Sequence, residues 1–284
     1  MTVAVSVKVN DGIVLAADSA TTMFAGNGHQ VWNNANKVFE LHRSLPIGGM
    51  CWGLGAIGNS SIETLAKDFR RRLMGLNLSF LDWEIDSNTY TLEAVANRFV
   101  EMFFDELYQP IYDEPWRRAV ADGDNPNLIL GFLIAGYSSQ QEQAESWLVV
   151  LDTPEHRPNP VAQFSKDSTG WVSYAQPEAV ERLFNGADGN LKARIAAATS
   201  ELPQDELVLS FEDARRSPVA NGMPFADAIN LARYMVDVTI GYSTYLFGPN
   251  TVGGPVDVAA ISRHEGFKWV SRKHYYSADL NQGR

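Results

Sequence analysis

The N-terminal segment constrains the fold of this chain most strongly, because two short apolar stretches there are joined by turn residues. Residues 3–9 read Val-Ala-Val-Ser-Val-Lys-Val and alternate, which is typical of a β-strand. Asn10, Asp11 and Gly12 then form a turn signal, and the strand-like run Ile-Val-Leu-Ala-Ala follows at residues 13–17. The sequence therefore predicts a β-hairpin at the start of the chain.

Strand-like and helix-like segments continue along the rest of the chain. Further strands are predicted over residues 37–42, 47–52, 128–137, 147–152, 161–164 and 256–261. Several of them are too close in sequence for helical crossovers, so the sheets should be largely antiparallel. Apolar residues repeat with helical period over 62–73, 91–103 and 225–236, and Ser60 and Glu63 have capping-box spacing before the first helix. This order predicts an α+β fold of stacked sheets with helices outside.

The length, the net charge and the apolar runs limit the classes of protein to which this chain can belong. The chain has 284 residues, 45% of them apolar, and no linker or composition shift divides it, so we expect one domain over residues 1–284. The formal net charge of -11 offers no basic stripe for a nucleic-acid partner. The longest apolar runs, 47–58 and 128–137, are shorter than the roughly 20 residues of a membrane-spanning helix, so no membrane association is expected.

The cysteine and histidine residues indicate which cellular compartment to expect and whether to expect a metal site. Cys51 is the single cysteine and cannot form an internal disulfide, which suits a reducing compartment. The N-terminus lacks the layout of a secretion signal, so we expect a cytoplasmic protein. The five histidines are scattered without ligand spacing, so we expect neither a metal site nor a cofactor.

The predicted hairpin brings two chemically useful residues together. If the turn centres near Asn10, the numbers of paired residues sum to about 20, which places Thr2 opposite Asp18 and Ala4 opposite Ala16 on the same face. Removal of Met1, which is usual before a small second residue, would give Thr2 a free α-amine beside its hydroxyl. An α-amine titrates near 7.7–8.0, so it can take the hydroxyl proton, and one residue then supplies both nucleophile and base.

Two further features suit the same chemistry. Lys37 opens a predicted strand and can point back to Asp18, where its ammonium would lower the proton affinity of the Thr2 hydroxyl and amine. The glycine-rich run 53–58 lies between a strand and a helix, and a free backbone amide there could stabilise an oxyanion. Taken singly, each residue also has an ordinary interpretation, namely a strand start for Thr2, a turn former for Asp18 and a surface lysine for Lys37.

Five stretches stand in a characteristic order along the chain. They are residues 2–5 (TVAV), 13–19 (IVLAADS), 36–41 (NKVFEL), 55–59 (GAIGN) and 253–259 (GGPVDVA). In order and spacing they resemble the proteasome β-subunit family and its simpler bacterial relatives, which are compartmentalised threonine peptidases of the N-terminal nucleophile (Ntn) hydrolase type. The resemblance implies a four-layer αββα sandwich with two mainly antiparallel sheets. It also implies a ring or other homo-oligomer that acts on peptides or unfolded proteins, with room for an unfoldase partner.

The resemblance also assigns residue roles. It makes Thr2 the nucleophile, Asp18 and Lys37 the charge pair beside it, and the Gly55 amide the oxyanion donor. It places the pocket for the residue before the cut around Thr21, Ala35, Phe39, Gly53, Ile57 and Ser61. None of these six positions carries a charge, so we expect a roomy, mostly apolar pocket.

The chain departs from the family pattern in two respects. Active β subunits support the threonine with serines and an aspartate from two later loops, whereas here Ser168, Thr169 and Gly170 run into a tryptophan, and Pro249 and Val252 stand where the others are expected. The segments near 75–127 and 187–224 are longer than the family core requires and read as helical elaborations.

Three alternative functions stay open at this point. The same threonine would serve an Ntn amidase acting on a small amide, and the missing supporting residues would fit a catalytically inactive proteasome-like scaffold. The run 53–58 is also a G-x-G-x-x-G with Asp82 and Glu84 at ribose distance, which would suit a dinucleotide-binding oxidoreductase. That fold needs parallel strands, which the closely spaced strands before residue 53 do not predict.

Overall fold

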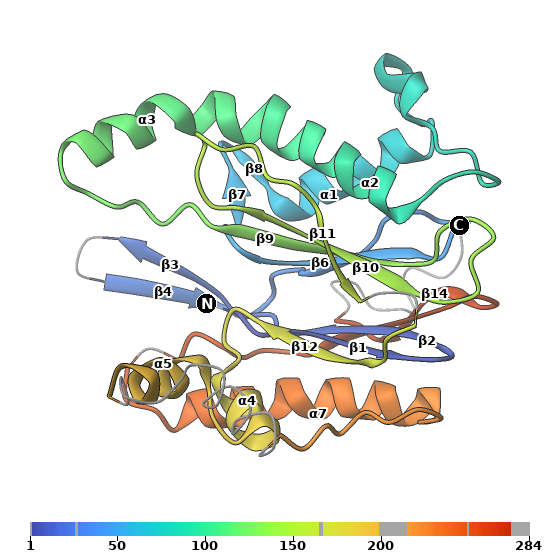
Figure 1. The fold of residues 1–284 in the computed structure, drawn as a ribbon. Helices are drawn as coiled ribbons and strands as arrows, with labels where there is room; N and C mark the ends of the chain where they lie inside the picture. Colours follow the sequence, from blue (N-terminus) through green and yellow to red (C-terminus); the bar gives the residue numbers. More distant parts are fainter. Residues whose placement is uncertain (1, 26–27, 165–166, 199–214, 249, 274–284) are drawn as a thin grey trace, which may run out of the picture.

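Two five-stranded antiparallel sheets form the centre of the protein (Figure 1). The computed structural model describes residues 2–25, 28–164, 167–198, 215–248 and 250–273. The first sheet has the order β12 (Gly170–Tyr174), β1 (Ala4–Val9), β2 (Gly12–Ala17), β13 (Asp257–Ser262), β14 (Gly266–Ser271). The second has the order β11 (Val161–Phe164), β10 (Glu145–Leu151), β9 (Leu130–Gly136), β6 (Ile47–Gly53), β5 (Val38–Glu40). Two small hairpins, β3 (Thr21–Ala25) with β4 (Gly28–Trp32) and β7 (Ala56–Ile57) with β8 (Ser60–Ser61), flank them.

Helices pack on both sheets. The helices are α1 (Ile62–Leu73), the 3-10 helix η1 (Leu78–Trp83), α2 (Leu92–Val100), the π-helical segment η2 (Glu101–Tyr108), α3 (Gln109–Ala121), α4 (Glu178–Asn185), α5 (Gly189–Ala198) and α7 (Phe225–Thr244). α7 lies against β1 and β2, and α2 lies against β9 and β10 (Figure 1). One core cluster fills the space between the second sheet and its helices, one lies between the first sheet and α7, and a third joins the two sheets. The architecture is thus mixed α/β with antiparallel sheets, as the strand spacing predicted.

The register of the first hairpin differs from the prediction by one residue. Val9 pairs with Gly12 across a two-residue turn, and Ala4 pairs with Ala17, so the numbers sum to 21. The predicted shared face of Ala4 and Ala16 is therefore wrong, because a one-residue shift moves every partner to the other side of a strand. Ala16 packs in the cluster under α7, whereas Ala4 lies between the two sheets.

The N-cap of the first helix lies one residue later than predicted. Ser61 is the N-cap, and its side chain accepts a hydrogen bond from the Thr64 amide at 3.2 Å. The predicted Ser60–Glu63 capping box is wrong, because Ser61 is the N-cap and the residue three positions after it is Thr64. Within the described part of the chain, no helix combines the length and apolar character that crossing a membrane requires.

Replacing the buried Lys8 by Met should stabilise the protein near neutral pH and remove a pH dependence of stability. Burial lowers the pKa of Lys8 to about 8, and the charges of Asp167 and Glu145 oppose this. The folded protein therefore releases this proton at a lower pH than the unfolded chain, which keeps it to 10.5. Between these values the free energy of unfolding of the parent protein should rise by about 3 kcal/mol relative to Lys8→Met.

Urea unfolding below, within and above this pH interval measures the effect. Lys268→Met, at an exposed position of β14, is the matched control and should leave the pH dependence unchanged. Equal pH dependence in the parent protein and Lys8→Met would contradict the prediction.

Candidate functional site

A buried carboxylate at the end of β2 organises the candidate site. Asp18 is completely buried. Its Oδ1 accepts hydrogen bonds from the Val3 amide at 3.1 Å and from Lys37 Nζ at 2.6 Å. Its Oδ2 accepts from the amides of Ala20 at 3.1 Å and Gly253 at 2.9 Å. Four donors thus satisfy a charge that would otherwise be costly to bury.

Lys37 completes the ion pair from the chain just before β5. Its side chain is 5% exposed, and its carbonyl accepts a hydrogen bond from the Cys51 amide at 2.8 Å, which fixes the backbone against β6. Burial lowers the pKa of Lys37, and the charge and hydrogen bond of Asp18 oppose that effect. The two predicted charged residues therefore meet, and Asp18 orients the ammonium and favours its charged form.

Thr2 and Lys37 line one cavity of about 220 Å³. Thr2 is 5% exposed, and the hydrogen bond from the next amide, that of Val3, to Asp18 fixes the start of the chain beside the ion pair. Gly55 lies on the wall of the same cavity. The structure therefore brings Thr2, Lys37 and Gly55 together around one space, with Asp18 buried next to it.

The two glycines of this wall have different roles. Among the described residues none accepts a hydrogen bond from the Gly55 amide, and a Cβ added at Gly55 would meet no atom within 4 Å. Gly53 has a φ of 91°, and a Cβ there would lie 2.1 Å from the Ile129 carbonyl oxygen. Gly53 is thus required by backbone packing, whereas Gly55 leaves an amide available to a ligand.

Four of the six residues predicted for the substrate pocket line the cavity, namely Thr21, Ala35, Gly53 and Ser61. The other two, Phe39 and Ile57, are buried in the core between the second sheet and its helices. The Phe39 ring stacks on Phe132 with a centroid distance of 6.0 Å. These two side chains therefore support the wall from behind.

The cavity also has lining residues that the sequence did not single out. They are Asn36, Cys51, Trp52, Leu54, Ile62 and Glu63. Burial raises the pKa of the Cys51 thiol to about 12, with the Lys37 charge opposing, so this thiol stays protonated at neutral pH. The sequence predicts a helix-capping role for Glu63, and its place in the first turn of α1, soon after the glycine run, is a signal for a cavity residue.

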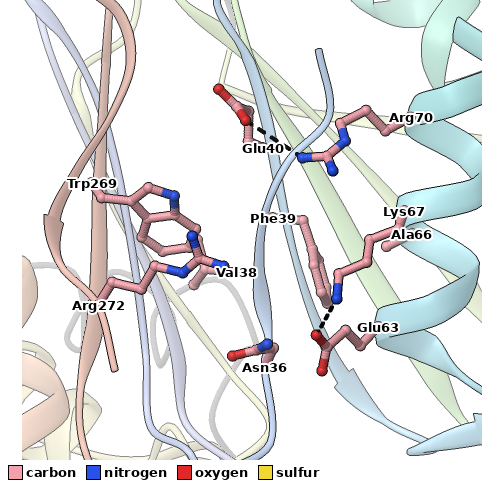
Figure 2. Close-up of a pocket in the computed structure, with 10 residues that line it drawn as sticks. All are labelled: Asn36, Val38, Phe39, Glu40, Glu63, Ala66, Lys67, Arg70, Trp269 and Arg272. Carbon is pink, nitrogen blue, oxygen red and sulfur yellow. Dashed lines mark hydrogen bonds and ion pairs between the residues drawn. The ribbon is translucent and has the colours of Figure 1, made fainter. Parts of the chain in front are cut away.

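Glu63 also borders a smaller adjoining groove of about 50 Å³ (Figure 2). In this view β5 runs between α1, which carries Glu63 and Lys67, and the chain that carries Trp269 and Arg272. Lys67 Nζ donates to Glu63 at 2.5 Å. Burial disfavours ionisation of Glu63, but hydrogen bonds from Lys67 and Asn36 outweigh it and hold its pKa below the ordinary value. The cavity wall therefore includes a carboxylate that is charged at neutral pH.

Two described residues of the later loops have contacts to groups other than Thr2. Thr169 Oγ1 donates to Asn221 at 3.2 Å, and Val252 is buried in the cluster under α7. Pro249 lies outside the described residues. In the part of the chain that the structure describes, no group of three or more His, Cys, Asp or Glu side chains could hold a metal ion.

Comparison with known proteins adds no family assignment. A scan against models of known protein families found none that matches the chain, and a search of curated proteins found no significant match. The functional argument therefore depends on the geometry of the cavity and on the residues that line it.

Proposed function

We propose that this protein is a threonine peptidase of the proteasome β-subunit type, in which Thr2 is the nucleophile after removal of Met1. The observation that carries the proposal is the shared cavity of Thr2, Lys37 and Gly55, with Asp18 buried beside it and hydrogen-bonded to Lys37. The packing of helices against both sheets supports the finer proposal of a four-layer αββα Ntn-hydrolase sandwich.

The residues suggest the following course for amide hydrolysis. The Thr2 hydroxyl oxygen attacks the carbonyl carbon, while the hydroxyl proton passes to the α-amine of Thr2, directly or through water. The resulting oxyanion accepts a hydrogen bond from the Gly55 amide. Collapse of this intermediate breaks the C–N bond, and the leaving amine takes the proton. Water then hydrolyses the Thr2 ester and restores the hydroxyl.

Lys37 assists these reaction steps through its charge. A neighbouring ammonium favours the alkoxide form of the hydroxyl and the neutral form of the amine, which are the forms the attack requires. Asp18 opposes the effect of burial on the pKa of Lys37, and its carboxylate, 2.6 Å from Nζ, stabilises the ammonium form. Asp18 therefore acts on Thr2 indirectly, by stabilising the charged form of Lys37.

The decisive experiment combines two questions in one measurement. Intact-mass spectrometry of the purified protein should show loss of Met1 and then the mass increase of one β-lactone or epoxyketone probe on Thr2. An unmodified mass after prolonged exposure, with Met1 absent, would refute the proposal. A retained Met1 would favour the inactive-scaffold alternative, because the amine would no longer be on Thr2.

The two enzymatic alternatives differ in assembly and in site geometry. A compartmentalised peptidase encloses its sites in a ring, so native mass spectrometry that finds a monomer would favour an Ntn amidase acting on a small amide. All strand pairs of the described residues are antiparallel, and the run Gly53 to Gly58 leads into the β7–β8 hairpin. This arrangement gives no support to a dinucleotide site, which needs a parallel βαβ unit.

Glu63→Gln should lower the tolerance of the site for basic residues. A partly exposed, already paired carboxylate is worth little, so we expect apolar peptides to remain preferred and the basic-to-apolar ratio of kcat/KM to fall about three-fold. A fluorogenic peptide panel measures the ratio. Glu40→Gln, which lines the adjoining groove but not the cavity, is the control. An unchanged ratio in Glu63→Gln would contradict the prediction.

A further inference from the structure

A second buried ion pair lies close to the Asp18–Lys37 pair. Lys273, which follows β14, contacts Asp257 Oδ2 through its ammonium and donates its backbone amide to Asp257 Oδ1 at 3.0 Å. The Lys273 and Asp257 side chains are 6% and 2% exposed. Charges held this far from solvent persist only where they are paired. The chemistry proposed for Thr2 does not use this pair directly.

Ser19 connects the two ion pairs. Lys273 Nζ donates to Ser19 Oγ at 2.7 Å, and Ser19 Oγ donates in turn to the Pro255 carbonyl at 2.6 Å. The Ser19 amide donates to the Gly253 carbonyl at 3.0 Å, and the Gly253 amide donates to Asp18 Oδ2 at 2.9 Å. Three hydrogen bonds, joined through the covalent structure of Ser19 and Gly253, therefore link the Lys273 ammonium to the carboxylate that holds Lys37.

We infer that the Lys273–Asp257 pair is a positioning element of the candidate site, which fixes Ser19 and thereby orients the adjacent Asp18 carboxylate toward Lys37. Ser19 and Asp18 are consecutive, so a displaced Ser19 rotates the carboxylate away from its donors. Neither Lys273 nor Asp257 lines the cavity, so their role is to position and not to contact substrate. The inference rests on the proposed function of Thr2, but the residues it concerns lie outside the reacting groups.

The charge of Lys273 has to be separated from its geometric role. Burial is the main cause that lowers the pKa of Lys37, and the Lys273 ammonium adds to it, whereas Asp18 opposes it. A variant that removes only the Lys273 charge would therefore mix two effects of opposite sign. A useful test changes the geometry and keeps the net charge.

Two variants meet this condition. Ser19→Ala removes the connecting hydroxyl and leaves both ion pairs in place. The double variant Asp257→Asn with Lys273→Met removes the second pair without changing net charge. In both we expect the rate of Thr2 acylation by a β-lactone, read as intact mass, to fall about tenfold. In Ser19→Ala the alkaline limb of the pH profile should also move to lower pH, because a displaced Asp18 no longer supports the Lys37 charge. The double variant removes the Lys273 charge, which itself lowers the pKa of Lys37, so its rate alone is the readout.

Two control variants separate a loss of positioning from a general loss of stability. Lys268→Met removes an exposed lysine of β14, the strand that precedes Lys273, and should leave the rate and pH profile unchanged. Lys273→Arg keeps the charge and the donors and should retain most of the rate. Wild-type rates in both test variants and a wild-type pH profile in Ser19→Ala, with melting temperatures near that of the parent, would overturn the inference. If the double variant does not fold, Ser19→Ala decides alone.

A second readout keeps the inference testable if the unaltered protein does not react with the probe at all. That result would defeat the proposed function but would leave the orientation of Asp18 undecided. Competitive labelling of Lys37 by acetic anhydride across pH, read by peptide mass, reports its titration without any activity. We expect a lower midpoint in Ser19→Ala than in the parent protein, and equal midpoints would overturn the positioning role.

Discussion

Thr2→Ala should abolish both probe labelling and peptide hydrolysis, with kcat/KM lower by at least about 10³-fold. Alanine is also small, so Met1 should still be removed and the α-amine should remain. The variant loses the hydroxyl and the methyl group of Thr2, and the Cys51 thiol, whose pKa burial raises to about 12, stays protonated and does not replace the hydroxyl as nucleophile. Hydrolysis of a fluorogenic peptide and intact mass after probe treatment measure the effect.

Thr2→Ser is the matched control, because it keeps both a hydroxyl and the α-amine. It should be labelled by the same probe and retain measurable hydrolysis. Residual hydrolysis by Thr2→Ala near the level of the parent protein would show that the nucleophile lies elsewhere. Loss of labelling in Thr2→Ser would show that the site requires more of the threonine than its hydroxyl.

The sequence was most informative where the chemistry depended on local pattern. An alternating stretch, a turn signal and a second strand-like run predict the first hairpin, and Lys37 at a strand start predicts its contact with Asp18, which the structure shows at 2.6 Å. The exact register was not predictable, because Asn10, Asp11 and Gly12 allow either a two- or a three-residue turn. A shift of one residue left Asp18 beside the N-terminus but exchanged the faces of its strand.

The remainder of the site depends on contacts between distant parts of the chain. The requirement for glycine at position 53 arises from the Ile129 carbonyl, and no local pattern around residue 53 reveals it. The contact of Lys273 with Asp257 depends on the pairing of β13 with β14. The spacing of Phe267 and Trp269 is a sequence signal for the strand β14.

Asp18→Asn should impair both stability and activity, because it removes half of a buried ion pair. The asparagine amide group cannot accept from both oxygen positions, so either Lys37 or the amides of Ala20 and Gly253 lose their acceptor. We expect the free energy of unfolding to fall by about 3–5 kcal/mol and kcat/KM to fall by about 10²-fold. Urea unfolding and peptide hydrolysis measure the two losses separately.

The pH dependence of the stability of Asp18→Asn shows whether loss of the ion pair with Lys37 causes these effects. Burial already lowers the pKa of Lys37, and without the Asp18 charge nothing of comparable strength opposes it. The folded variant then holds a neutral Lys37 over a pH range in which the unfolded chain, with a pKa of 10.5, still binds the proton. Its stability should therefore rise with pH up to about 10.5 more steeply than that of the parent.

Asp18→Asn combined with Lys37→Met should lose this rise and regain part of the stability, but should recover no activity. Recovery of activity in the double variant would mean that the ion pair serves the fold alone.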